Sequence, residues 1–307
     1  MPKKDKTLET CRAEIDAIDN SILELLAKRV QVVREVGEIK NADTKGKKSA
    51  RKSIIRPGRE AEMVRRIARQ KNENLPHAAA LAQMWRLIIA SAVTIEEGNA
   101  RVVTLSTDTN RECYWLAREY FGAFTPMHEK ATVAEVVQDV VECRATVGVL
   151  PLWDRSGPRP WWSRIEGDDT HDMPRIFARL PFIQMARSSK APLVAIGYVD
   201  PEETGEDESL WVIRAEEKVQ FSLLDPLLEA AGLDYVHLET CRVLGVPNTH
   251  HYLIEINGFA GGEDPRLRKF LDKARRKFDA LVLPISAHYL GSYAVPILFE
   301  REAAEET

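Results

Sequence analysis

The sequence predicts a multidomain protein in which an all-α region of three helices precedes an α/β lobe and a final α+β part. Three observations support this prediction. Apolar residues recur in a strict heptad over residues 8–40, short apolar runs typical of strands begin at Arg101, and the last third has the order β-α-β-β-α-β. That order is the ferredoxin-like signature. We expect domains over residues 1–99, 100–190 and 191–300.

Residues 8–40 are expected to form one helix about 48 Å long, at a rise of about 1.5 Å per residue. No proline interrupts this stretch, and its first glycine is Gly37. Two apolar lines make up its seam: Leu8, Ile15, Ile22 and Val36 in the first, and Cys11, Ile18, Leu25, Val32 and Ile39 in the second. Two shorter helices, one starting at Pro57 and one running from about His77 to Glu97, cannot cover a seam of this length. The sequence therefore predicts an intertwined helical homodimer.

Arg29 occupies a position in this apolar seam, between Ile22 and Val36. A cation there must find an anionic partner or incur a large desolvation cost. Lys40 lies about 20° around the helix and about 16 Å along it from Arg29. Two long cationic side chains on one face predict a clamp for a small anion. On the helix alone the alternative stays open that Arg29 reaches to the rim of the seam and that Lys40 is solvated.

Arg12 lies about 100° away from the face of this clamp and about 25 Å along the helix. It cannot serve the same clamp from the same chain. If Arg12 binds the ligand, it serves a second copy of the site in the dimer.

Composition argues against several classes of protein. A charged fraction of 29% and a hydrophobic fraction of 44% are those of an ordinary soluble protein. The net charge of -4 gives no support to nucleic-acid binding, and the basic run Lys45–Lys52, which lacks aromatic residues, is interpreted as a solvated loop. No apolar run suits a membrane span or a secretory signal. The four cysteines form no CxxC pair, which favours a reducing cytoplasm and argues against a zinc site: Cys11, Cys113, Cys143 and Cys241.

The α/β lobe is expected to begin with a strand in RVVTLST and a helix in ECYWLAREYFG, followed by a helix in VAEVVQDVVECR and a strand in ATVGVLPLW. Residues 155–190 are interpreted as a long connection with one short helix near Arg175–Leu180. In the final part, the last strand is expected in DALVLPISA, at residues 279–287.

The first hundred residues resemble the all-helical chorismate mutases. The resemblance rests on LxxxRxxIDxIDxxILxLLAxRxxVVxxVGxxK, then RPxRE, then a third helix ending in LIIASAVTIE. It implies an isomerase that converts chorismate to prephenate in phenylalanine and tyrosine biosynthesis. This unimolecular reaction needs no cofactor, no metal and no nucleophile. It needs a site that folds the enolpyruvyl arm over the ring and stabilises negative charge growing on the ether oxygen.

The resemblance also implies roles for individual residues. Arg29 would pair with one carboxylate of chorismate, and Arg12 of the partner chain with the other. Lys40 would hydrogen-bond the ether oxygen and a carboxylate. Glu96 would donate to the ether oxygen from the other side, at a helix C-terminus that disfavours an ionised carboxylate.

Two residues of the RPxRE motif complete the implied site. Arg59 would support the anion-binding network, and Glu60 would accept a hydrogen bond from the ring hydroxyl. The alternatives are that Arg59 is a surface residue and that Glu60 only complements the dipole of its helix. The sequence departs from some relatives at Arg56, where they carry an acidic residue.

The remainder resembles, more faintly, a prephenate dehydratase followed by an ACT regulatory domain, in Val147–Pro151 and in the LGSY of residues 290–293. The first strand ends in LSTDTNREC where a GPxGTFS-like loop is expected, and residues 208–211 (ESLW) replace the catalytic TRF. A GALV loop is absent, and the ESRP motif survives only as ETCR at residues 239–242. We interpret residues 100–300 as a noncatalytic remnant, for which the ACT resemblance implies an aromatic amino acid effector.

Three functions therefore compete. The intact charged positions of the motif favour an active chorismate mutase with a noncatalytic C-terminal region. A regulator with a vestigial mutase site and a bifunctional chorismate mutase/prephenate dehydratase are the alternatives, and the missing dehydratase motifs argue against the second.

Overall fold

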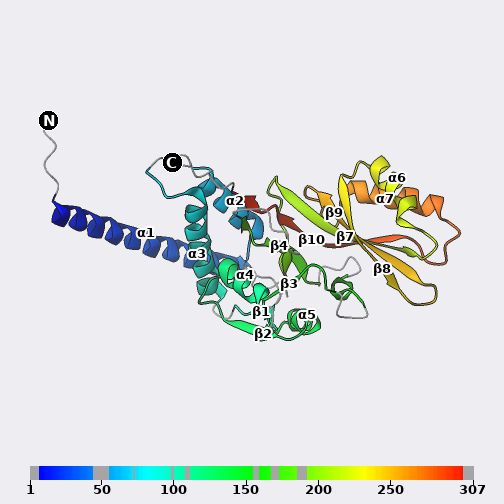
Figure 1. The fold of residues 1–307 in the computed structure, drawn as a ribbon, viewed down its shortest axis with the longest axis horizontal. Helices are drawn as coiled ribbons and strands as arrows, with labels where there is room; N and C mark the ends of the chain where they lie inside the picture. Colours follow the sequence, from blue (N-terminus) through cyan, green and yellow to red (C-terminus); the bar gives the residue numbers. More distant parts are fainter. Residues whose placement is uncertain are drawn as a thin grey trace, which may run out of the picture.

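The computed structural model describes residues 7–43, 55–70, 72, 74–97, 100–107, 111–154, 159–166, 173–184 and 192–299. Three helices come first: α1 (Leu8–Asp43), α2 (Pro57–Ala68) and α3 (Ala78–Glu97). The rest of the chain builds a large mixed sheet with helices packed on both faces (Figure 1). This arrangement confirms the predicted multidomain class. The basic run Lys45–Lys52 lies outside the described residues.

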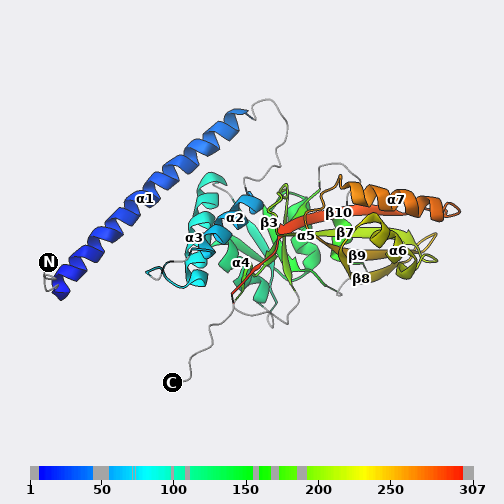
Figure 2. The same ribbon diagram turned by 90° about the horizontal axis from the view of Figure 1, so that it is seen from above.

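Helix α1 extends away from the rest of the molecule as a single rod of 36 residues (Figure 2). Its length agrees with the heptad prediction. The apolar side chains of the seam are exposed to between 39% and 69% of their surface: Leu8, Ile15, Ile18, Ile22, Leu25, Val32, Val36 and Ile39. A continuous apolar stripe of this kind is unusual on the surface of a monomer.

The main sheet has nine strands in the order β2-β1-β3-β6-β4-β10-β7-β9-β8. Its first half contains β1 (Val102–Leu105), β2 (Met127–Lys130), β3 (Val147–Pro151), β4 (Arg175–Leu180) and β6 (Leu193–Gly197). Its second half contains β7 (Asp207–Glu216), β8 (Tyr235–Val243), β9 (Thr249–Asn257) and β10 (Ser286–Ala294). A separate two-stranded sheet joins β5 (Ile183–Gln184) and β11 (Ile297–Leu298).

The two halves of the main sheet are continuous. Strand β4 is antiparallel to β6 on one side and parallel to β10 on the other. The boundary predicted at residues 190/191 therefore falls between two strands of one sheet.

Three apolar cores surround this sheet. The first packs α2, α3 and α4 (Glu112–Phe121) on one face of the first half, around Phe177. The second packs α5 (Val133–Val141) and the short helix η1 (Trp161–Arg164) on the opposite face, around Trp162. The third lies under α6 (Phe221–Ala231) and α7 (Pro265–Lys277) in the second half. Helices α2 and α3 thus share a core with the α/β lobe.

The ferredoxin-like order is confirmed in β7-α6-β8-β9-α7-β10. These strands pair in the spatial order β10-β7-β9-β8, and every pair is antiparallel. Both helices lie on one face of the sheet (Figure 1), where they bury Trp211, Ile213 and Ile254. Helices α6 and α7 do not cover the other face of these strands.

The short helix predicted near Arg175–Leu180 is wrong, because these residues form β4. Ile176 packs in the core on one face of the sheet, whereas Phe177 and Leu180 pack in the core on the other. A strand buried on both faces reads as a short apolar run with no clear period, and the sequence pattern alone does not separate it from a helix. The helix of this connection lies earlier, at η1.

Two further strands differ from the predictions. The last strand begins at Ser286 and not at residue 279, and Pro284, which has no backbone N–H for a sheet, lies just before it. Strand β2, which has the letters MHEK, was not predicted from the sequence. Strand β2 pairs only with β1 at the edge of the sheet, so it needs no apolar pattern.

The pairing of β10 with β4 depends on Gly291. Its φ is +146°, and a Cβ atom there would lie 1.9 Å from the carbonyl oxygen of Ile176 on β4. That oxygen belongs to the backbone of a central strand, so it cannot move aside cheaply. We expect Gly291→Ala to lower the free energy of unfolding by more than about 3 kcal/mol, measured by urea denaturation.

Gly232→Ala is the matched control for this substitution. Gly232 ends α6 at a φ of +85°, but nothing lies within 4 Å of its virtual Cβ. It should lose only about 1 kcal/mol, the cost of a left-handed backbone conformation. Equal losses for the two variants would contradict a steric requirement at Gly291.

Candidate active site

The predicted site residues come from all three N-terminal helices. Arg29 is half-buried and its Nη1 donates to the carbonyl oxygen of Ile88 on α3, at 3.4 Å. Arg12 is exposed and makes no hydrogen bond or ion pair within the described part of the chain. Lys40 belongs to α1 and Glu96 to α3, but their side chains lie outside the described residues.

Glu60 is buried between α2 and α3, with 7% of its surface exposed. Its Oε2 accepts a hydrogen bond of 2.7 Å from Nη2 of Arg86, which is only 3% exposed. Arg86 also donates from Nε to the backbone carbonyl oxygen of Tyr120 at 2.9 Å. Its guanidinium lies 3.8 Å from the centre of the aromatic ring of Tyr120. Burial opposes the charge of Arg86, but Tyr120 and Glu60 outweigh it and raise the pKa of Arg86.

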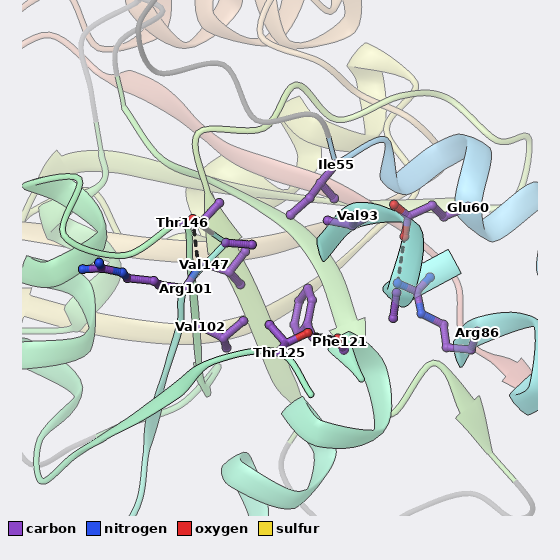
Figure 3. Close-up of a pocket in the computed structure, with 12 residues that line it drawn as sticks. Ile55, Glu60, Arg86, Val93, Arg101, Val102, Phe121, Thr125, Thr146 and Val147 are labelled. Carbon is purple, nitrogen blue, oxygen red and sulfur yellow. Dashed lines mark hydrogen bonds and ion pairs between the residues drawn. The ribbon is translucent and has the colours of Figure 1, made fainter. Parts of the chain in front are cut away.

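The second carboxylate oxygen of Glu60, Oε1, makes no hydrogen bond among the described residues. Glu60 and Arg86 line a small cavity with Phe121 and Val147 (Figure 3). Its volume of about 20 Å³ has room for about one water molecule, far less than a small-molecule site requires. The cavity by itself therefore does not form a substrate site in one protomer.

Arg86 was not among the predicted site residues, although the sequence contains a signal for it. Arg86 lies four residues from Ala82 and from Ala90, and both alanines are buried on α3. An arginine in line with small buried residues is as anomalous as Arg29 in the seam of α1, and needs an anionic partner for the same reason.

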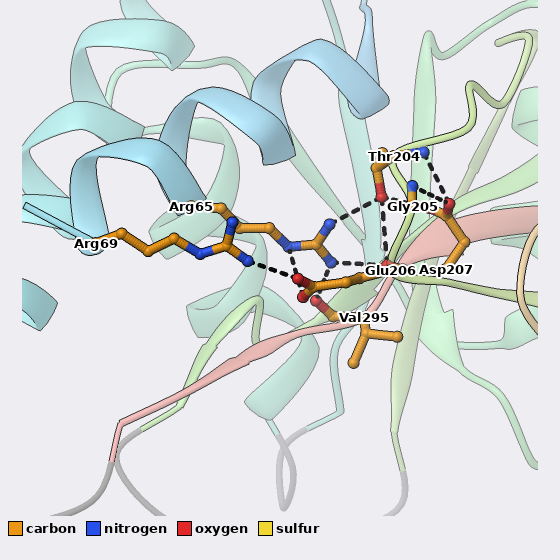
Figure 4. A network of polar contacts seen from close by, with 7 residues as sticks. All are labelled: Arg65, Arg69, Thr204, Gly205, Glu206, Asp207 and Val295. Carbon is orange, nitrogen blue, oxygen red and sulfur yellow. Dashed lines mark hydrogen bonds and ion pairs between the residues drawn. The ribbon is translucent and has the colours of Figure 1, made fainter.

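Helix α2 is held by a polar network at the end of the sheet (Figure 4). The guanidinium of Arg65 donates to Thr204 Oγ1 at 2.8 Å, and to the carbonyl oxygens of Glu206 and Val295 at 2.7 and 2.8 Å. Arg69 adds an ion pair of 2.5 Å to the carboxylate of Glu206. These contacts attach the helix that carries Arg59 and Glu60 to the turn just before β7 and to the segment after β10.

The start of α2 makes a second contact with the same region. Arg56 pairs with Glu202, its Nε lying 2.8 Å from Oε1, so it has a structural partner at the position where some chorismate mutases carry an acid. The backbone N–H of Arg59 donates to Glu202 Oε2 at 3.4 Å, while the side chain of Arg59 is exposed. The structure thus brings Arg29 to α3 and joins Glu60 to Arg86, but leaves Arg12 and Arg59 on the surface.

Comparisons with known proteins support the resemblance seen in the motifs. Residues 11–97 match the family described as Chorismate mutase type II. A bifunctional chorismate mutase/prephenate dehydratase of Aquifex aeolicus (strain VF5) is 30% identical over 148 residues, which cover 47% of this chain and 38% of that protein. The chain therefore spans about two fifths of the length of this relative. The resemblance of the N-terminal third is confirmed.

Solved structures with some likeness to the chain include two prephenate dehydratases. That of Streptococcus mutans has a TM-score of 0.45 and 11% identity, over 66% of this chain and 100% of its own. That of Arthrobacter aurescens, in complex with L-Phe, has a TM-score of 0.44 and 13% identity, over 64% of this chain and 90% of its own. Likenesses at these scores do not define the activity of this chain.

Within the described residues, no group of three or more His, Cys, Asp or Glu side chains is placed to hold a metal ion. No helix of the described chain combines the length and the apolar character needed to cross a bilayer.

The Glu60–Arg86 pair predicts a strong energetic coupling. Removing one partner leaves an uncompensated buried charge, so we expect Glu60→Gln and Arg86→Met each to lower the free energy of unfolding by about 3–5 kcal/mol. The double variant should lose less than the sum by about 1–3 kcal/mol, measured by urea denaturation.

The control pair is the exposed hydrogen bond from Gln83 to Glu119, 2.7 Å long, which joins α3, the helix of Arg86, to α4. The cycle of Gln83→Ala and Glu119→Ala should give a coupling energy below about 0.5 kcal/mol. A similar value for Glu60 and Arg86 would contradict a buried ion pair.

Proposed function

We propose that this protein is a chorismate mutase, an isomerase that converts chorismate to prephenate in aromatic amino acid biosynthesis. The match of residues 11–97 to the type II family is the observation that carries the proposal. The reaction is intramolecular, so the site has to bind one dianionic substrate in a reactive shape and stabilise charge on its ether oxygen. Cationic side chains on fixed helices can do both without a cofactor.

Arg29 is the residue of the proposed site with the clearest structural support. It lies half-buried against α3, beside apolar residues, where a charge-assisted hydrogen bond to a carboxylate is strong. We assign one substrate carboxylate to Arg29 and the ether oxygen to Lys40 and Glu96. Arg59 supports the bound anion from α2.

Glu60 is assigned to the ring hydroxyl of chorismate. Arg86 holds its Oε2, which fixes the carboxylate and leaves Oε1 to accept from a ligand. The ion pair therefore supports a positioning role for Arg86 in the same site. It also requires that α2 and α3 keep their present packing when substrate binds.

The proposed site includes Arg12 of a second copy of the chain. The exposed seam of α1 supports this proposal, since burying it against a partner would remove a large apolar surface from water. Arg12 lies on the same helix as Arg29 but far along it, so it can reach only the site of the partner. The homodimer and the two shared sites are one proposal.

We propose that residues 100–300 are not catalytic. The absence of the TRF and GPxGTFS-like motifs supports this assignment. The bifunctional alternative is favoured by the Aquifex relative, whose match of 148 residues is longer than the family match. A regulator with a vestigial mutase site is the third candidate. An aromatic amino acid effector rests on the ACT resemblance, and a cytoplasmic location on the four unbonded cysteines.

The activity is tested by following the loss of chorismate absorbance with the full-length protein. Arg29→Ala should lower kcat/KM about 100-fold or more, since a desolvated charge-assisted contact is lost. Arg34→Ala, which removes an exposed arginine of the same helix, should leave it unchanged. More than a tenth of wild-type activity in Arg29→Ala would contradict the clamp, and an inactive wild type would favour the regulator.

The same reaction mixtures separate the bifunctional alternative. The wild type should form prephenate, which appears as phenylpyruvate only after the sample is acidified. Enzyme-dependent phenylpyruvate at neutral pH would show that residues 100–300 retain dehydratase activity.

Complementation tests the shared site. Arg12→Ala and Lys40→Ala chains should each be inactive, but a mixed dimer has one site with both changes and one with neither. Equal mixing should restore about a quarter of wild-type activity, because about half of the dimers are mixed and each holds one intact site. No recovery, with heterodimers verified by mass spectrometry, would rule out Arg12 acting in the partner site.

A further inference from the structure

A cavity in the C-terminal region, lined by Arg159, Arg214 and His251, shares no lining residue with the proposed mutase site. Its volume is about 450 Å³, within the range of small-molecule sites. The walls come from the segment 159–166, from residues of β7, β8, β9 and β10, and from Leu283 and Pro284 just before β10. Arg214 on β7 pairs in register with His251 on β9 and with Ser286 on β10. All three line the cavity, from neighbouring positions on three adjacent strands.

Unpartnered polar atoms gather beside this cavity. Glu166 Oε1, Arg214 Nε and His251 Nδ1 are buried and have no hydrogen-bond partner in the described part of the chain. The side chain of Glu166 is fully buried and its other oxygen pairs with Arg214, while His251 Nδ1 lies 3.5 Å from Oε1. Buried polar groups in native proteins are nearly always satisfied by protein, water or ligand, so a cluster of three marks a place where a polar molecule belongs.

The charge around the cavity favours an anion. Arg159 and Arg214 both line it, and Glu166 balances only one of them. Burial, together with Arg214 and Arg159, lowers the pKa of His251 to about 4, so this imidazole is neutral near pH 7. The net charge of these four groups is therefore one positive unit, which matches a singly charged anion better than a doubly charged one.

Part of the remaining wall is apolar, although Ser163, Thr249 and His288 also line the cavity. Val243, Leu283 and Pro284 line the cavity, and Leu283 and Pro284 belong to the segment just before β10. A ligand that fits this lining has one negative group for the arginines and an apolar body for Val243, Leu283 and Pro284. The exposed position of Arg159 leaves its guanidinium able to close over such a ligand.

We propose that this cavity is a binding site for a small organic carboxylate, held by Arg159 and Arg214 with its apolar body against Val243, Leu283 and Pro284. The site belongs to the C-terminal region and goes beyond the proposed mutase function. Its ligand contacts do not involve α1, α2 or α3.

Titration calorimetry on the full-length protein at pH 7 tests the proposal. The probe is 3-phenylpropanoate, compared with its neutral amide, 3-phenylpropanamide, and with inorganic phosphate. We expect one carboxylate bound per chain, and the amide and phosphate bound at least tenfold more weakly. Equal binding of the amide, tighter binding of phosphate, or no binding of the carboxylate at millimolar concentration would overturn the proposal.

Variants locate the binding. Arg159→Ala should raise the Kd about tenfold or more without unfolding the chain, because Arg159 is exposed. Arg164→Ala removes an exposed arginine of η1 that does not line the cavity, and should leave the Kd unchanged. Arg29→Ala should also leave it unchanged, whether or not the mutase proposal holds. An unaltered Kd in Arg159→Ala, or a loss of binding in Arg29→Ala, would overturn the site.

Discussion

The pairing of β10 with both β4 and β7 holds the C-terminal two thirds of the molecule together. It joins an α/β lobe and a ferredoxin-like part into one sheet, and it requires a glycine where two backbones come into close contact. Two of the three helices that carry the candidate active site, α2 and α3, pack on this sheet. A change at the β4–β10 contact would therefore alter the packing of α2 and α3, although neither strand contributes a predicted site residue.

Helices α2 and α3 belong to the core of the sheet and also carry residues of the candidate site. One side of the pair is buried against α4 and the sheet, and is held there by Arg65 and by the Glu60–Arg86 pair. This packing makes them a rigid support and leaves α1 with few partners in its own chain. The apolar seam of α1 then becomes the natural place for a second copy, and the proposed sharing of Arg12 follows from the same geometry.

The C-terminal region has a ferredoxin-like order of strands and helices. Its sequence lacks the TRF, GPxGTFS-like and GALV letters of the dehydratase and ACT motifs. The uncovered face of the sheet instead carries Arg214 and His251 beside a fully buried glutamate. Buried charge that the packing alone does not satisfy is more informative about this region than its resemblance to a family.

The sequence by itself determined the long helix α1, the start of α2 at Pro57, the extent of α3 and the order of the ferredoxin-like part. Each of these has a local cause, either a sustained period of apolar residues or a proline or glycine at a boundary. The anomaly of Arg29 was also visible, because a single cation in a heptad stands out.

Only the tertiary structure decided that residues 175–180 form a central strand, that Glu60 pairs with Arg86, and that Arg214 and His251 meet beside a cavity. β4 is a strand because two cores and two neighbouring strands surround it, and none of them is close in sequence. Glu60 and Arg86 are 26 residues apart, and the remaining partner, Tyr120, lies 34 residues further on. Contacts between residues so far apart in the sequence depend on how whole helices and strands pack together. A local periodicity of apolar residues does not predict that packing.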